Sequence, residues 1–300
     1  MHTTAVVRWD PLSWRTATAL TTVYLAWGGT YVAIRVMVET LPPLISTGAR
    51  FLIAGALLGA WLRARGRRLR ASRRELLGAA AIGTVILGDI GLLAVAEREV
   101  PAGLAALLIA TVPLWVVALR LAAGERMSHA TLAGVLLGLA GVALLVLPGD
   151  RPEGAPLGWL LVLVGAAAIE AAGQFASQRT PLPRDLLWTT ALQLLAAGAV
   201  LVLAGAATGE VAAGAGRVST ESAVAFGYLV LPGSILAYSA FVWLLEHEPV
   251  STVATYAYVN PVVALVLGWL VLGEGLTATM AAGSVVVVGS VAFVVRRESG

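Results

Sequence analysis

The sequence predicts an all-α polytopic membrane protein with ten transmembrane helices arranged as two inverted five-helix repeats. Composition is the first observation: 59% of the 300 residues are hydrophobic and only 12% are charged, whereas a soluble domain is about half apolar and about a quarter charged. Apolar runs of about twenty residues, the length that crosses a hydrocarbon core of ~30 Å, follow one another along the chain. Short motifs in the first half also recur, in the same order, in the second half.

The ten spans are placed by the length of each apolar run and by the Gly, Pro and charged residues that end it. Their expected limits are 16–38, 42–62, 75–96, 101–121 and 129–148 in the first half, and 157–178, 184–207, 222–245, 249–272 and 277–295 in the second. Pro148 and Gly149 separate the two halves. Because the connections are short, consecutive spans are expected to be antiparallel neighbours.

The distribution of arginine predicts the orientation. Seven arginines crowd into the loop between the second and third spans: Arg63, Arg65, Arg67, Arg68, Arg70, Arg73 and Arg74. With the N-terminus in the cytoplasm, fifteen arginines lie in cytoplasmic segments and three, Arg98, Arg151 and Arg217, lie in outer segments. Positive charge beside a span resists translocation, so both termini are expected in the cytoplasm. The expected location is the inner (plasma) membrane of a bacterium, and the first apolar run is interpreted as a span, not as a cleaved signal peptide.

The residue types that the chain lacks exclude several classes of protein. There is no cysteine, and all twenty basic residues are arginine. The sequence therefore has no disulfide framework, no thiolate metal site, no lysine for a Schiff base and no Walker lysine. His2, His129 and His247 lie near span ends or a terminus and form no metal-ligand pattern. We expect no cofactor and no metal, and we interpret the arginines as determinants of topology, not as a nucleic-acid surface.

An internal repeat divides the ten spans into two units of five. The recurring residues are Pro101 and Pro113 followed by Gly124-Glu125, and Pro249 and Pro261 followed by Gly273-Glu274. Because an odd number of spans reverses the direction of the chain, the second unit is expected to be inverted. The predicted domains are a first repeat over 16–148 and an inverted repeat over 157–296. Inverted repeats are typical of secondary transporters, which bind substrate near the midplane between the halves. Each Gly-Glu step is interpreted as a turn at a span end.

Several short motifs resemble those of a known family. They are Trp27-Gly28-Gly29-Thr30-Tyr31 with Ala33 and Ile34, Pro42-Pro43 with Arg50-Phe51, Val112-Pro113, Asn260-Pro261, and the Gly-Glu-x-x-Ser/Thr segments that begin at Gly124 and Gly273. Over nearly the whole chain the sequence resembles the drug/metabolite transporter superfamily, and specifically the EamA-type transporters. The resemblance implies a carrier of small metabolites such as amino acids, with export the more common direction. The sixth span departs from the pattern, because it carries Glu170 and Gln174 where Trp27 and Tyr31 would be echoed.

Charged residues inside spans are the first candidates for a site, because each one is costly to hold in hydrocarbon unless it is paired or hydrated. Arg50 lies about eight residues into the second span, ~12 Å deep, and Asp89 lies ~10 Å deep in the third. An Arg50–Asp89 pair is therefore sterically reasonable. It has two interpretations, a clamp between two helices or a substrate and proton site.

Glu170 lies near the middle of the sixth span among small residues, with Gln174 one turn further along the same helical face. No arginine of its own repeat lies at that depth. Glu170 then finds a partner in the other repeat, faces a hydrated cavity, or is protonated and bonded to backbone. Asp89 and Glu170 are the candidates for proton coupling.

Trp27 and Tyr31 lie four residues apart near the middle of the first span, away from the interfaces where aromatic residues usually gather. They form either a stacking surface for an organic substrate or a packing surface for another helix. Arg35 and Glu39 are expected to extend to the nearby interface.

Prolines within three spans predict helix breaks or hinges at Pro113, Pro232 and Pro261. Polar and aromatic residues beside them, Trp115, Tyr238, Tyr256 and Asn260, are further candidates for substrate binding. Broken helices at matching positions of two repeats often mark a transporter site. A bare kink without substrate contact is the alternative.

These observations predict a carrier that works by alternating access around a midplane cavity, with a lipid bilayer and a small molecule as its partners and no nucleic acid. A channel and a membrane-embedded enzyme are the alternatives. An enzyme is not expected, because no motif supplies a nucleophile and base or a metal at one depth. Whether the chain forms a homodimer, and whether transport is coupled to protons, the sequence leaves open.

Overall fold

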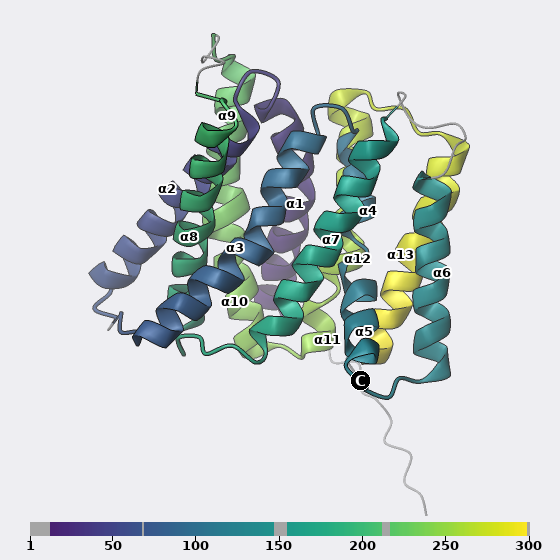
Figure 1. Ribbon diagram of the computed structural model, residues 1–300, viewed down its shortest axis with the longest axis horizontal. Helices are drawn as coiled ribbons and strands as arrows, with labels where there is room; N and C mark the ends of the chain where they lie inside the picture. The colour runs from purple at the N-terminus through teal and green to yellow at the C-terminus, as the bar shows by residue number, and fades with distance from the viewer. Residues whose placement is uncertain (1–12, 68, 147–154, 212–216, 299–300) are drawn as a thin grey trace, which may run out of the picture.

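The computed structural model describes residues 13–67, 69–146, 155–211 and 217–298, and every regular element in these ranges is a helix (Figure 1). The predicted break at Pro148 and Gly149, together with His2, Arg8 and Arg151, lies outside the described residues. The predicted all-α fold is confirmed.

The helices follow the predicted spans closely. The first half contains α1 (Trp14–Met37), α2 (Pro43–Ala64), α3 (Arg73–Ala96), α4 (Ala102–Ile109), α5 (Val112–Ala122) and α6 (His129–Val146). The second half contains α7 (Leu157–Ser177), α8 (Leu186–Ala207), α9 (Thr220–Val230), the π-helical segment η2 (Leu231–Leu236), α10 (Ala237–His247), α11 (Val250–Val253), α12 (Tyr256–Leu267), the π-helical segment η3 (Gly268–Leu272) and α13 (Ala278–Glu298).

Within the described ranges these elements form ten rods that lie side by side (Figure 1). Eight of them are long and apolar enough to cross a membrane. The remaining two are α1, whose sequence contains several threonines and an arginine, and the shorter rod Tyr256–Leu272. We call the end of the bundle where α1 begins and α13 ends the proximal end. The opposite end, where α1 leads into α2, is the distal end.

Local sequence explains where several rods begin and end. Ser72 and Glu75 form a capping box at the start of α3, in which each side chain accepts a hydrogen bond from the other residue's backbone N–H. Gly124 and Gly273 adopt positive φ angles of 87° and 68°, the left-handed conformation that ends a helix and that glycine tolerates best. The Gly-Glu steps are therefore turns at rod ends, as predicted.

Two of the three predicted breaks occur near their prolines. The fourth rod divides between α4 and α5 just before Pro113, and Pro232 lies in the π-helical segment η2. The break predicted at Pro261 is wrong, because α12 continues through that proline. Pro261 is the sixth of the twelve residues of α12 and removes the hydrogen bond to the carbonyl of Ala257. Helices that cross a membrane tolerate such a proline, because neighbouring helices and side chains satisfy the freed carbonyl. The ninth rod is interrupted instead between α11 and α12.

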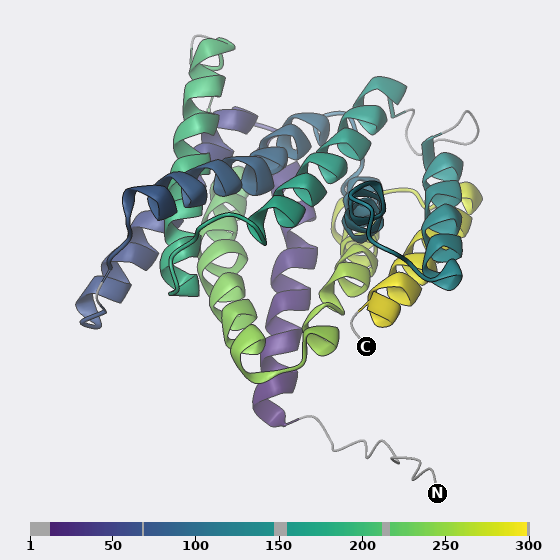
Figure 2. The same cartoon turned by 60° about the horizontal axis from the view of Figure 1, so that its bottom comes forward.

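The contacts between the two halves are approximately symmetric. The main pairs of packed rods stay the same when the two halves are exchanged. The second rod, α2, packs on α8, which is the second rod of the other half, and α6 packs on α13, the fifth rod on the fifth. These pairs stand at opposite sides of the molecule, with α1 near its middle (Figures 1 and 2). The contacts of α3 with α7 correspond in the same way to those of α1 with α9 and α10. Such a pattern is expected of two inverted five-helix repeats.

Small residues allow the closest of these approaches. A Cβ atom added to Gly48 in α2 would lie 2.7 Å from the carbonyl oxygen of Gly198 in α8, and one added to Gly198 would lie 2.8 Å from the carbonyl oxygen of Gly48. Helices in lipid associate through close backbone contacts of this kind, because no hydrophobic driving force brings them together there.

Candidate functional site

Aromatic side chains from two other rods surround Trp27 in the middle of α1. Its ring centroid lies 5.2 Å from that of Tyr238, 5.1 Å from that of Phe241 and 5.3 Å from that of Tyr256. The two tyrosines meet the indole edge-to-face, the arrangement that aromatic pairs prefer. Trp27 Nε1 donates a hydrogen bond of 3.1 Å to the carbonyl oxygen of Gly233. The indole N–H thereby finds its acceptor in a backbone carbonyl of the π-helical segment η2, just after Pro232.

Two carboxyl groups lie in contact between α3 and α7. The side chains of Asp89 and Glu170 lie close enough to interact directly. Gln174 Nε2 also donates a hydrogen bond of 2.9 Å to Glu170 Oε1. Two carboxylates held this close repel each other, which favours a single proton shared between them. The neighbouring carboxyl group of Glu170 thus comes from the other half of the chain.

Three tyrosines complete the surroundings of the carboxyl pair. Tyr31 and Tyr238 interact electrostatically with both carboxyl groups, and Tyr256 interacts with Glu170. These tyrosines and Glu170 lie among protein atoms deep in the bundle, yet each is only half-buried. We refer to Trp27, Tyr31, Asp89, Glu170, Gln174, Tyr238, Phe241 and Tyr256 as the central cluster.

Arg50 is buried in α2 and makes no ion pair with Asp89. The expected pair is absent among the described residues, and both Arg50 Nε and Asp89 Oδ1 lack a hydrogen-bond partner. The Arg50 guanidinium instead lies 4.6 Å from the centroid of the Phe51 ring and interacts electrostatically with Tyr238 and Glu97. Arg50 therefore lies beside the central cluster, within electrostatic reach of both Tyr238 and Glu97.

Two predicted site residues contribute differently. Asn260 is 7% exposed and its Oδ1 has no partner, and its backbone carbonyl approaches Gly28, next to Trp27. Trp115 packs against the main hydrophobic core, where its Nε1 has no hydrogen-bond partner. No ring contact joins Trp115 to the central cluster among the described residues.

Glu97, which the sequence did not single out, is the most deeply buried carboxyl group at the distal end. It follows the last residue of α3, is 0% exposed, and neither of its carboxyl oxygens has a hydrogen-bond partner. Its charged neighbours are Glu274, Arg35 and Arg50. Arg35 does not extend to the interface as expected, because its Nη1 donates a hydrogen bond to the backbone carbonyl of Glu97.

Two further glutamates of the second half hold helices of the first half at the distal end. Glu274 accepts hydrogen bonds from the backbone nitrogens of Ala102 (2.6 Å) and Gly103 (3.0 Å) at the start of α4. Glu210 accepts bonds from the backbone nitrogens of Leu44 (3.1 Å) and Ile45 (2.9 Å) at the start of α2. A carboxylate at a helix N-terminus satisfies free N–H groups and complements the helix dipole. The repeated Gly-Glu step pointed to Glu274, although not to this contact.

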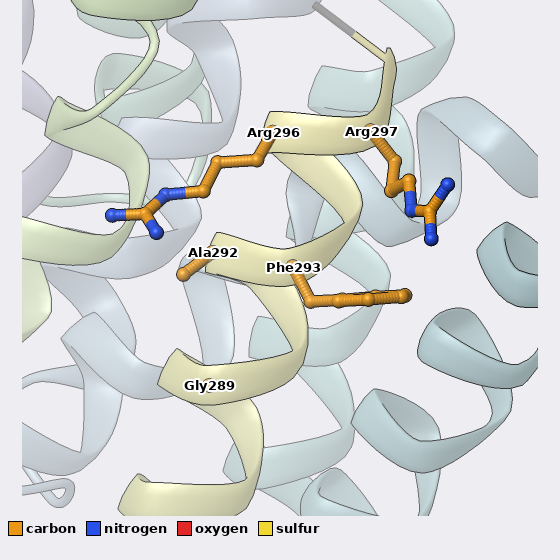
Figure 3. Close-up of a pocket in the computed structure, with 5 residues that line it drawn as sticks. All are labelled: Gly289, Ala292, Phe293, Arg296 and Arg297. Atoms are coloured by element: carbon orange, nitrogen blue, oxygen red, sulfur yellow. The ribbon is translucent and has the colours of Figure 1, made fainter.

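A separate surface hollow of about 420 Å³ lies along the proximal part of α13 (Figure 3). It is lined by Gly289, Ala292, Phe293, Arg296 and Arg297, and the Arg297 guanidinium lies 5.6 Å from the Phe293 ring centroid. None of these residues belongs to the central cluster. Among the described residues, no group of three or more His, Asp or Glu side chains could hold a metal ion.

Comparison with known proteins agrees with this architecture. The chain is 40% identical over 261 residues to YedA, an uncharacterized inner membrane transporter of Escherichia coli K12, with 86% of this chain and 83% of the relative covered. It is 27% identical to a probable amino-acid metabolite efflux pump of Salmonella typhimurium LT2, covering 88% and 89% of the two chains. It is also 29% identical to a probable terminal-alkyne amino-acid exporter of Streptantibioticus cattleyicolor, covering 94% of each.

A solved crystal structure shares the fold, with a TM-score of 0.64 and 23% sequence identity over 95% of this chain and 99% of the other. The signature of the EamA-like transporter family matches residues 14–147 and again residues 157–296. The chain therefore belongs to the EamA-like transporter family, as the motifs around Trp27 and the Gly-Glu steps predicted.

Proposed function

We propose that this transporter exports small organic metabolites such as amino acids by alternating access around the central cluster. The observation that carries the proposal is the cluster itself. It places a carboxyl pair and five aromatic rings at the junction of α1, α3, α7, α10 and α12, where both halves contribute. The printed names of two relatives, an amino-acid metabolite efflux pump and an amino-acid exporter, support the substrate class.

The chemistry of the cluster suits a zwitterion that carries an organic side chain. A protonated amine would bind beside Asp89 and Glu170, and aromatic faces near it add a cation–π attraction. The substrate carboxylate would bind the guanidinium of Arg50, whose Nε has no partner. When the ammonium group binds, it would take the place of the proton that the two carboxyl groups share, and that proton would leave to water. This exchange would couple export to proton entry.

The half-buried state of Tyr31, Glu170, Tyr238 and Tyr256 supports a water-accessible space inside the bundle. A side chain that lies deep among protein atoms and still retains accessible surface borders such a space. The halves, predicted as repeats over 16–148 and 157–296, would rock about the central cluster and open each end in turn.

We further propose that the proximal end faces the cytoplasm of a bacterium and that the protein lies in the inner membrane. The arginine-rich loop between α2 and α3 lies at the proximal end, together with the start of α1 and the end of α13 (Figure 1). Positive residues concentrate on the cytoplasmic side of a membrane protein.

Counterflow in reconstituted vesicles tests the proposal. Vesicles loaded with one unlabelled amino acid at a time are placed in the same labelled amino acid, with and without a pH gradient. Saturable counterflow is expected for at least one amino acid, and Glu170→Gln and Trp27→Ala should reduce it at least tenfold. Glu246→Gln, at an exposed carboxyl near the proximal end of α10, is the matched control and should transport normally. Normal counterflow in both cluster variants, or ohmic conductance without saturation, would contradict the proposal.

A further inference from the structure

The distal end contains a cluster of charged groups around Glu97, a residue that the proposed substrate site does not use. Glu97 at the end of α3 faces Glu274 beyond η3, Arg35 in α1 and Arg50 in α2, and Tyr31 in α1 also interacts with it. Another carboxylate at this end, Glu210, caps α2. Glu97 differs from Glu210 and Glu274, because its two oxygens accept no hydrogen bond at all.

A buried carboxyl group without partners needs an explanation, because desolvation without compensation is costly. Glu97 avoids most of that cost if it carries a proton and is neutral. Burial raises the pKa of the Glu97 carboxyl well above its usual range, and the adjacent Glu274 carboxylate raises it further, while Arg35 and Arg50 act in the opposite direction. The net direction is upward.

The burial of Glu97 depends on the distal end being closed. Glu274 packs beside it and ties the region beyond η3 to the start of α4 through two hydrogen bonds. A methyl group on Gly268 would collide with the Glu274 carboxylate, so the carboxylate occupies a space that the sequence leaves for it. If the halves separate here, α4 and Glu274 move apart and water reaches Glu97.

We propose that Glu97 is a proton-binding site that links distal opening to pH: the closed distal end holds its proton, and opening releases that proton to the distal compartment. On release, the O–H bond of the carboxyl breaks, water accepts the proton, and the carboxylate is left facing the guanidinium groups of Arg35 and Arg50. This inference rests on the alternating access proposed above. It identifies Glu97 as the residue that senses the pH of the distal compartment.

The direction of the pH effect follows from linkage. The Glu97 carboxyl has a higher pKa in the closed arrangement than in the open, hydrated one. Its proton therefore stabilises the closed arrangement in full when the pH is below the pKa of a hydrated carboxyl, about 4.3. That stabilisation is lost as the pH rises through the raised value in the closed arrangement. Higher distal pH therefore favours opening, and lower distal pH favours closure.

Cysteine accessibility tests the inference, because the chain has no native cysteine. Val100→Cys places the reporter at a position that is 0% exposed near Glu97, and Val211→Cys, at a distal position that is 66% exposed, corrects for the pH dependence of the thiol reaction. The probe is a membrane-impermeant charged maleimide. The corrected labelling rate of Val100→Cys is expected to rise with pH by about threefold or more per unit, up to the limit of about tenfold for one proton.

Glu97→Gln cannot ionise, so in that background the reporter should label slowly at every pH. Glu99→Gln, at an exposed carboxyl two residues away, is the matched control and should retain the slope. A flat profile in the parent, or an unchanged slope in Glu97→Gln, would overturn the inference. The parent profile decides the question alone if Glu97→Gln fails to fold, as judged by size-exclusion chromatography. Counterflow is measured separately, so a parent that transports but shows a flat profile refutes the proton site and leaves the carrier standing.

Discussion

The contact between Glu274 and α4 gives a quantitative prediction about the balance between closed and open distal ends. Glu274→Ala removes a carboxylate that accepts two backbone hydrogen bonds at 2.6 and 3.0 Å and is only 5% exposed. In the closed arrangement the N–H groups of Ala102 and Gly103 would then be buried without an acceptor. In an open arrangement water satisfies both groups, so the substitution penalises the closed arrangement selectively.

The size of the effect follows from the cost of an unsatisfied donor. Leaving a buried N–H group without a partner costs about 1–3 kcal/mol, and two such groups together cost about 3 kcal/mol with some relaxation. Since each 1.4 kcal/mol is a factor of ten, the ratio of open to closed molecules should rise on the order of a hundredfold. Glu274→Gln retains one acceptor oxygen and should raise the ratio on the order of tenfold.

Labelling of the Val100→Cys reporter at one fixed pH measures this ratio. The expected order of labelling rates is Glu274→Ala above Glu274→Gln above the parent. Thermal stability in detergent should follow the reverse order, with Glu274→Ala the least stable. Glu246→Ala, at an exposed carboxyl of α10, should label as slowly as the parent. Equal rates in the parent and in Glu274→Ala would refute the reasoning, because the two hydrogen bonds would then contribute nothing to closure.

Three other substitutions test the central cluster and the packing of the halves. Trp27→Phe keeps an aromatic ring but loses the 3.1 Å hydrogen bond to the Gly233 carbonyl. It should raise the KM for counterflow about fivefold, equivalent to about 1 kcal/mol. An unchanged KM would show that this hydrogen bond does not contribute to substrate binding. Asp89→Asn leaves one ionisable carboxyl in the pair, so counterflow should become insensitive to an imposed pH gradient, and a retained gradient effect would exclude Asp89 from coupling. Gly48→Val forces a side chain against Gly198 and should destabilise the protein by about 1–3 kcal/mol, seen as a lower melting temperature, while unaltered melting would show that α2 and α8 separate freely.

Rod limits were predictable from the sequence because they depend on local properties. An apolar run must match the hydrocarbon thickness, and breakers such as Gly124 and Gly273 end helices wherever they occur. The predicted limits 42–62 and 157–178 therefore fall close to α2 (Pro43–Ala64) and α7 (Leu157–Ser177). Pro261 shows the limit of local rules, since α12 continues through this proline although the sequence predicts a break there.

The contacts of the charged residues could not be predicted in the same way, because they depend on packing between the halves. Depth alone suggested that Asp89 would pair with Arg50, whereas the approach of α3 to α7 gives it Glu170 as a partner. Glu97 was overlooked because a carboxyl just beyond a span end is normally hydrated. Only the three-dimensional closure of the distal end buries it.

The two Gly-Glu turns show how a nearly symmetric fold can close one end more firmly than the other. Glu274 lies buried against a helix of the opposite half at the distal end. Its repeat counterpart Glu125, at the proximal end, makes ion pairs of 2.7 Å with Arg120 and 3.6 Å with Arg179. These side chains are 32–56% exposed, and exposed pairs contribute about 0–1 kcal/mol.

Equivalent positions in the two repeats thus hold bonds of unequal strength in one structure. A perfectly symmetric arrangement would give both glutamates the same surroundings and would close both ends equally. Under the alternating access proposed above, this structure corresponds to the end state in which the distal end is closed. It also explains why Glu97, and no carboxyl at the proximal end beside Glu125, is buried without a partner among the described residues.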